Sequence, residues 1–318
     1  MSSEDIEVVE ASANDYARFF GPNGYGDIFL TPEYNLLNSA KTVGIVFLVF
    51  KRRNIPIAGI IFGTEGTVLK APFSAPYGGF TIKGRHSFST LMSIGVLLKD
   101  YCIRKGMMCE IIFPAPVGHD RTVTMNQTMI SILSSIGFQV MYLDINYHID
   151  IKSVINVNSD LKRRYDIFKK NGGLFSFSLI NNDFSKIYDV IRRNHEDLGF
   201  QINMSESDFR NVSHIIPVYQ YGATINDEIA AGAICYQTRP NILQLIWWGD
   251  NLEYRKKGGV MPYLALQMLY SIHREMSEIS YLDLGPASSK GKLLQGLCDF
   301  KQSLGGFPTQ KMKLCFRN

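Results

Sequence analysis

The pattern of hydrophobic and polar positions divides the chain into two series of elements with the same order. Apolar residues at every second position predict strands, and apolar residues three and four positions apart predict amphipathic helices. In the first half they predict a hairpin, a helix, a strand, a helix that stops at Gly137 and a further strand, at residues 44–51, 56–62, 88–105, 110–113, 124–136 and 139–145.

The second half repeats this core. It begins with a helix that Asn158 or Ser159 would cap, and a capping box at 205–208 starts another helix. The remaining patterns predict a helix, a hairpin, a helix, a strand, a helix that stops at Gly305 and a last strand, at residues 183–198, 228–237, 242–248, 261–276, 281–285, 293–304 and 311–316.

This repetition predicts an α/β fold (α+β mixed sheets flanked by helices) in two similar domains. Gly59 and Gly232 occupy matching places in the two hairpins, at similar distances before Gly137 and Gly305. We therefore expect an N-terminal domain over residues 1–152 and a C-terminal domain over residues 153–318.

Composition narrows the class of protein. Hydrophobic residues make up 46% and charged residues 19% of the 318, which is typical of a globular chain. A net charge of +4 is too small to indicate nucleic-acid binding by itself. The five cysteines lack CxxC spacing and the six histidines lack HExxH spacing, so we expect no disulfide framework and no metal site. The acidic N-terminus and the short apolar run at 43–50 predict a cytoplasmic protein without a membrane span.

The strongest candidate for chemistry follows the second hairpin. Trp247, Trp248, Gly249 and Asp250 lead into a basic, glycine-bearing loop, and a helix begins directly after it; the loop residues are Arg255, Lys256, Gly258 and Gly259. Free N–H groups at a helix N-terminus bind anions, and glycine lets the backbone approach a phosphate. The alternative interpretation is a solvated basic turn.

Four other side chains carry an ionisable group at a position that makes them candidates for a functional site. Asp283 interrupts an apolar strand, where a carboxylate is either held by main-chain donors or exposed at the strand end. Tyr221 precedes the second hairpin, and Lys301 lies on the helix after the Asp283 strand. His195 is a candidate base on a helix, although the sequence identifies no partner for it.

Three segments together resemble a known family. Residues 281–286 (YLDLGP), followed by Phe300-Lys301 and Gly305-Gly306, are similar to the signature that closes the Fem-type branch of the GNAT acyltransferases. Residues 71–79 (APFSAPYGG) resemble a segment of that branch's first domain, and residues 161–172 (LKRRYDIFKKNG) resemble the helix that opens its second. The branch includes peptidoglycan-bridge aminoacyltransferases and FemAB-like acetyltransferases.

The resemblance implies two tandem GNAT-like domains, the first degenerate and on the acceptor side, the second holding the acyl donor. Acetyl-CoA or another acyl-CoA would bind between the strands at 242–248 and 281–285, with its pantetheine arm along 247–251 and its diphosphate at 255–260. Val260 stands where the usual GNAT loop has glycine or alanine. The coiled-coil arm of the bridge-forming enzymes has no counterpart between Lys170 and Asp227.

Within this frame, the expected catalytic residues are Asp250 or Asp283 as the base and Tyr221 or Lys301 as the acid or a donor contact. Three functions follow. The first is transfer of an acyl group from acyl-CoA to an amine of a small molecule, sugar or cell-wall precursor. The second is a Fem-type aminoacyltransferase whose donor, aminoacyl-tRNA, would contact Lys162, Arg163 and Lys170. The third is a binding module that keeps the GNAT frame without catalysis.

Overall fold

The chain divides into two compact units, and each unit is built from segments that are separated in the sequence. The computed structural model describes residues 6–21, 26–118, 121–157, 163, 166, 170, 175–180, 184–200, 202–255 and 259–317. Unit 1 consists of Met1–Ile145, Ser288–Lys292 and Thr309–Asn318, and unit 2 consists of Asn146–Ala287 and Leu293–Pro308. The division into GNAT-like domains at residue 152 stays a prediction.

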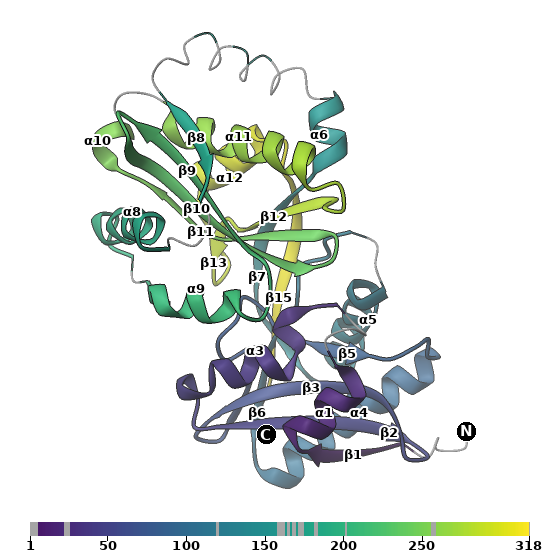
Figure 1. Ribbon diagram of the computed structural model, residues 1–318. Helices are drawn as coiled ribbons and strands as arrows, with labels where there is room; N and C mark the ends of the chain where they lie inside the picture. The colour runs from purple at the N-terminus through teal and green to yellow at the C-terminus, as the bar shows by residue number, and fades with distance from the viewer. Residues whose placement is uncertain are drawn as a thin grey trace. The chain divides into compact units, whose positions relative to one another are not determined.

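Unit 1 contains a mixed sheet in the order β1-β2-β3-β4-β6-β15, with β5 paired to β3 (Figure 1). The neighbouring strands are antiparallel except for the parallel pair β4 and β6. These strands are β1 (Ile6–Ala11), β2 (Gly44–Arg52), β3 (Ile55–Glu65), β4 (Val68–Ala71), β5 (Phe80–Ile82), β6 (Met108–Ile112) and β15 (Phe307–Phe316).

Alternating side chains of β2 give unit 1 a hydrophobic core on each face of its sheet. Phe47 and Val49 pack with the helix α1 (Ala13–Phe20). Leu48 and Phe50 belong to the larger core, which α4 (Phe88–Lys105) and α5 (Arg121–Ser135) cover. The period of two along a strand thus gives each face its own helix layer. Two short helices, α3 (Pro32–Leu37) and α6 (Ile151–Val157), belong to units 1 and 2 respectively.

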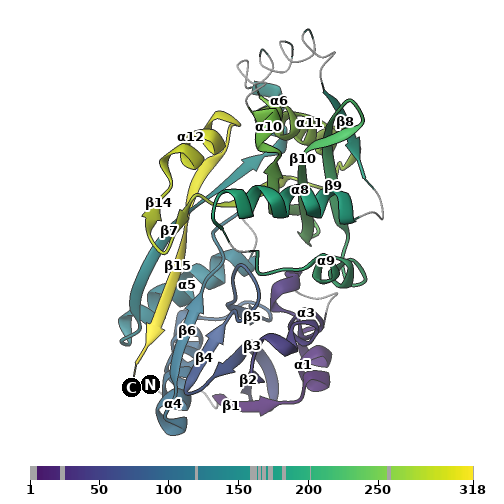
Figure 2. The ribbon, with the colours of Figure 1, turned by 90° about the vertical axis from the view of Figure 1, so that its left-hand side faces the viewer.

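Unit 2 repeats this strand order as β8-β9-β10-β11-β12-β7, and its parallel pair is β11 and β12. Figure 2 shows α8 in front of β9 and β10, and α11 packs against β9, β10 and β11. The elements are β7 (Gln139–Asp150), β8 (Ser176–Leu179), α8 (Phe184–Asp197), α9 (Glu206–Ser213), β9 (Val218–Ile225), β10 (Glu228–Arg239), β11 (Ile242–Asp250), α10 (Leu252–Arg255), α11 (Val260–Glu275), β12 (Tyr281–Pro286) and α12 (Gln295–Ser303).

Most predicted elements are confirmed, and several of the missed ones are short or polar. Helix α4 spans the predicted 88–105, and both predicted hairpins form. Strands β1, β4, β8 and β9 and helix α1 were not predicted; β1, for example, has glutamate at two of its six positions. The helix predicted to start at Asn158 or Ser159, and most of the segment 161–172, lie outside the described residues.

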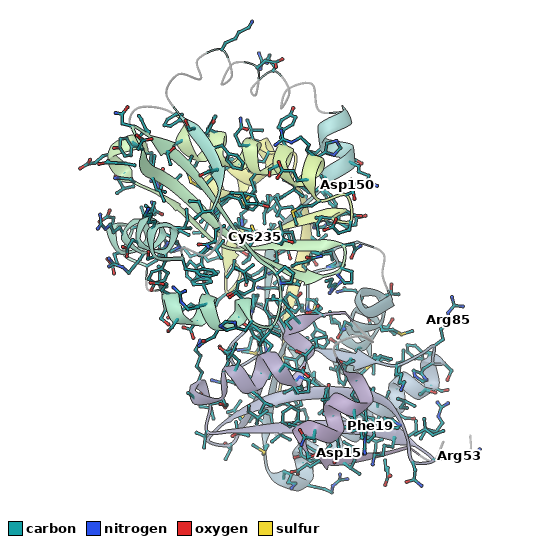
Figure 3. The ribbon with its side chains drawn as sticks, viewed as in Figure 1. Asp15, Phe19, Arg53, Arg85, Asp150 and Cys235 are labelled. Carbon is teal, nitrogen blue, oxygen red and sulfur yellow. The ribbon has the colours of Figure 1, made fainter. Side chains whose placement is uncertain are left out.

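Cys235 lies in the interior of unit 2 on β10 (Figure 3). Its Sγ is 3.9 Å from the Met268 Sδ of α11, and burial raises the pKa of its thiol. All five cysteines are free. Cys235 is therefore a core side chain rather than a reactive thiol.

The matching glycines of the two hairpins each lie beneath a helix, Gly59 beneath α1 and Gly232 beneath α8. A Cβ on Gly59 would lie 2.6 Å from Tyr16 Cε2 and 2.7 Å from Phe20 Cε2, both on α1. A Cβ on Gly232 would lie 3.0 Å from Cγ2 of Ile187 on α8. Each glycine thus lets a helix pack directly on its sheet, which gives the sequence repeat a physical reason.

We predict that Gly59→Ala destabilises the protein by about 1–3 kcal/mol, because the aromatic rings of α1 must move. The midpoint of thermal unfolding measures the loss. Gly296→Ala is the control, since a Cβ on Gly296 has nothing within 4 Å and alanine favours a helix. An unchanged midpoint for Gly59→Ala would contradict the close packing of α1.

Candidate active site

The parallel strands β11 and β12 pair over only three residues and then diverge. Residues 242–244 of β11 pair with 281–283 of β12, whereas β11 continues to Asp250. A β-bulge accompanies the divergence: Leu245 and Trp247 face consecutive residues of β10, so Ile246 has no opposite residue. Bulges bend a strand and are frequent beside active sites.

A cavity of about 600 Å³ lies beside the free end of β11. The end of α8, the end of β11, the start of α11 and the start of α12 enclose it. Its lining is mostly apolar, and the charged or amide-bearing side chains come from α8, β11 and α10 only. The lining residues are Asn194, His195, Leu198, Phe200, Trp248, Gly249, Asp250, Arg255, Gly259, Val260, Met261, Pro262, Leu294, Gly296, Leu297 and Phe300. The rings of Trp248 and Phe300, both in this lining, pack against each other with centroids 5.4 Å apart.

Asp250 is buried at the end of β11 and fully hydrogen-bonded. Asn194 Nδ2 donates to its Oδ1 at 2.8 Å and to its backbone oxygen at 2.7 Å. Arg255 donates from Nε to Oδ2 at 3.0 Å and from Nη2 to Oδ1. This bidentate pair raises the pKa of the half-exposed Arg255 guanidinium. The geometry suits a carboxylate that positions an arginine rather than one that accepts a proton.

Helix α11 begins at the same cavity without a side-chain cap. Gly259 precedes the helix with φ +83°, and no side chain caps the N-terminus. The Tyr263 N–H bonds to the Gly259 oxygen, so the N–H groups of Val260 and Met261 have no partner within the helix. The positive end of the α11 dipole therefore lies at this cavity, beside the Arg255 guanidinium, whose charge Asp250 balances. Lys256 and Gly258 lie outside the described residues.

His195 lines this cavity from α8, where sequence reasoning identified no partner for it. Its Nδ1 lies 2.8 Å from the Ile191 oxygen, which accepts the Nδ1 proton and leaves the Nε2 lone pair free in the neutral ring. The Trp247 ring packs edge-on against the imidazole, with centroids 4.6 Å apart. Only the non-local contact of α8 with β11 brings His195 to the site, and no local sequence pattern encodes it.

Asp283 is buried on β12 and does not line the cavity. Its Oδ1 accepts the Asn146 Nδ2 and the Gly285 N–H, both at 2.8 Å, so the carboxylate ties β7 to the bend of β12. Burial lowers the pKa of His148, the residue opposite in β7, and the charge of Asp283 opposes that shift. Since Asp250 is six residues beyond the residue paired with Asp283, the two carboxylates are about 20 Å apart along the strand.

Lys301 is buried on α12, and its ammonium binds the end of β12. Nζ donates to the oxygens of Leu284, Gly285 and Pro286 at 2.7, 3.0 and 2.8 Å. These three carbonyls lie where β12 no longer pairs with β11. Lys301 therefore stabilises the separated strand end, a contact to the chain itself rather than to the cavity.

Tyr221 also lies away from the cavity. Its hydroxyl donates to Met276 Sδ at 3.7 Å, and its ring stacks on Phe177. Burial raises its pKa far above the ordinary value, which makes it unsuited to exchange protons. Of the predicted site residues, the structure brings together Trp248, Gly249, Asp250, Arg255 and Gly259 at the cavity, with Trp247 beside them; Asp283, Tyr221 and Lys301 lie elsewhere.

Two kinds of feature are absent from the described part of the chain. No helix there is both long and apolar enough to cross a membrane. Within the same ranges, His, Cys, Asp and Glu side chains form no group of three that could hold a metal ion.

We predict that Lys301→Met lowers stability by about 2–4 kcal/mol, because three buried carbonyls lose their donor. The thermal midpoint should fall by about 4 °C or more. Gln302→Met, the exposed neighbour on the same helix, is the matched control and should leave the midpoint unchanged. A normal midpoint for Lys301→Met would contradict this structural role.

Comparisons place the fold among known structures. No family model and no curated protein matches the chain. The chain is similar to the crystal structure of FemX, with a TM-score of 0.62 and 10% identity over 98% of this chain and 97% of that chain. It is also similar to the structure of L-PGS from Bacillus licheniformis, with a TM-score of 0.56 and 13% identity over 96% of this chain and 90% of that chain. For a tandem GNAT protein from the clavulanic acid biosynthesis pathway, the TM-score is 0.53 and the identity 11% over 98% of both chains. The predicted α/β class is confirmed, and the fold is like those of FemX and of the tandem GNAT protein.

Proposed function

We propose that this protein is an N-acyltransferase that binds acyl-CoA in the cavity of unit 2 and transfers the acyl group to an amine of a small molecule, sugar or cell-wall precursor. The observation that carries the proposal is the divergence of β11 from β12 beside the electropositive start of α11. The solved structures with this fold support it, since they include FemX and a tandem GNAT protein whose structure is described as lacking AcCoA.

The donor would bind along the free edge of β11. Residues 245–250 have no β12 partner, so their backbone groups are available to the amides of a pantetheine arm, as to an added strand. Trp247, Trp248 and Gly249 belong to this stretch. Arg255, held by Asp250, and the N–H groups of Val260 and Met261 would bind the diphosphate next to Gly259. Lys256 and Gly258, which the sequence also suggests for this site, lie outside the described residues.

Unit 1 lacks the corresponding free edge, which favours one donor site per chain. All four residues of β4 pair with β6. The chain after β4 then returns, so that the Gly78 N–H donates to the Ile112 oxygen at 2.8 Å. Lys311 Nζ fixes the same loop through the Pro76 oxygen at 3.2 Å. The loop thus lies beside the end of β6, where a donor would have to bind in unit 1. Unit 1 would therefore bind the acceptor rather than a second donor.

His195 is the residue we propose for proton transfer. The acceptor amine would attack the thioester carbonyl, forming the C–N bond and breaking the C–S bond. His195 Nε2 would take the amine proton and return it to the departing thiolate of CoA. Backbone N–H groups near the bulge at Ile246 would polarise the carbonyl. Asp250 would act by positioning Arg255 rather than as an acid or base. Asp283, Tyr221 and Lys301 do not line the cavity, so they are not proposed as acid or base either.

The test is calorimetric titration of CoA and acetyl-CoA into the wild type, Met261→Glu and Met261→Gln. Met261 lies in the first turn of α11, where a carboxylate favours the helix but repels a phosphate. We predict micromolar binding by the wild type, at least about tenfold weaker binding by Met261→Glu, and nearly normal binding by Met261→Gln.

Equal binding by the two Met261 variants would contradict a diphosphate at α11. No binding of CoA by the folded wild type would contradict an acyl-CoA donor. Aminoacyl-tRNA should then be titrated, with Arg163→Ala and Lys170→Ala as variants, because tRNA binding would depend strongly on salt. A chain that binds neither donor is the non-catalytic module.

A further inference from the structure

We infer that the donor carries an aliphatic acyl chain of medium length, which binds against the apolar wall of the unit 2 cavity. The inference rests on the proposed function, because it needs a thioester donor in that cavity. It goes beyond that function in naming the acyl group.

One wall of the cavity has no polar side chain. Helix α12 and the residue before it contribute Leu294, Gly296, Leu297 and Phe300. The four polar side chains of the lining come from α8, β11 and α10 and belong to the positioning and proton-transfer groups already described. The side chains of the α12 wall therefore offer no hydrogen bond to a charged or hydroxylated acyl group, whereas they suit methylene groups.

The rim of the same cavity exposes large apolar side chains to solvent. Leu198 is 45% exposed, Phe200 56% and Leu294 38%. These three come from two segments distant in the sequence and converge on one hollow. Isolated exposed apolar residues need no explanation, but a group that lines a concave site indicates an apolar ligand.

An acetyl group would leave this wall largely in contact with water. It has three heavy atoms, whereas the cavity of about 600 Å³ equals the volume of roughly twenty water molecules. A pantetheine arm would fill part of that volume along β11, and its amides would pair with the strand. The space against α12 is left for a chain that gains affinity with each buried methylene.

The experiment compares CoA, acetyl-CoA and octanoyl-CoA by calorimetry with the wild-type protein. We expect octanoyl-CoA to bind at least about tenfold more tightly than acetyl-CoA, since six more methylenes enter the apolar space. Leu297→Gln should remove most of this gain and leave acetyl-CoA binding within about twofold. Leu293→Gln is the matched control, because Leu293 is exposed, lies outside the cavity lining and should keep the gain.

Equal affinities for acetyl-CoA and octanoyl-CoA, with CoA itself bound, would overturn this inference and leave the proposed donor site standing. A gain for octanoyl-CoA that Leu297→Gln does not reduce would also overturn it, because the chain would then bind elsewhere. Absence of binding by all three forms would overturn the proposed function and this inference with it.

Discussion

The separation of β11 from β12 after three residue pairs is the constraint on which the site depends. Two adjacent parallel strands that diverge leave unpaired backbone groups on both edges, and buried groups of this kind must find other partners. On β12 the partner is the Lys301 ammonium, which binds three successive carbonyls. On β11 the bulge at Ile246 and the adjoining cavity leave room for a ligand. The separated edge of β12 is thus stabilised by Lys301, whereas the separated edge of β11 is available to a ligand.

The polar residues around β11 form an ordered set that begins with Asn194. Its amide holds both the backbone and the side chain of Asp250, Asp250 holds Arg255, and Arg255 lies beside the uncapped start of α11. The next residue along α8 is His195, whose Nδ1 is bonded to the helix backbone. One helix therefore supplies both the residue that anchors the Asp250–Arg255 pair and the proposed proton acceptor. Gly249 allows this arrangement, because a Cβ there would lie 2.9 Å from Asn194 Cβ.

The sequence alone predicts the repeated order of strands and helices and both hairpins, since these depend on local periodicity and turn residues. Of the predicted basic loop, Arg255 lies in the short helix α10, and residues 256–258 lie outside the described residues. The sequence could not assign the polar side chains, because their roles depend on partners distant in the chain. Asp283 resembles a site residue until Asn146 is seen to bind it from β7, and Lys301 resembles a solvent-facing lysine or a catalytic acid until its three carbonyl partners are known. His195 is a candidate base without an identified partner in the sequence, because Trp247, which packs against it, is more than fifty residues away.

The measurement that tests the central claim most directly uses the only two tryptophans of the chain, Trp247 and Trp248, which are adjacent in β11. Tryptophan fluorescence is recorded while CoA is titrated into the wild type, Trp247→Phe and Trp248→Phe. The account predicts a saturable change with the midpoint found by calorimetry, carried mainly by Trp248, which lines the cavity. Calorimetric binding of CoA with no change in the fluorescence of either tryptophan would place the donor elsewhere and contradict the account.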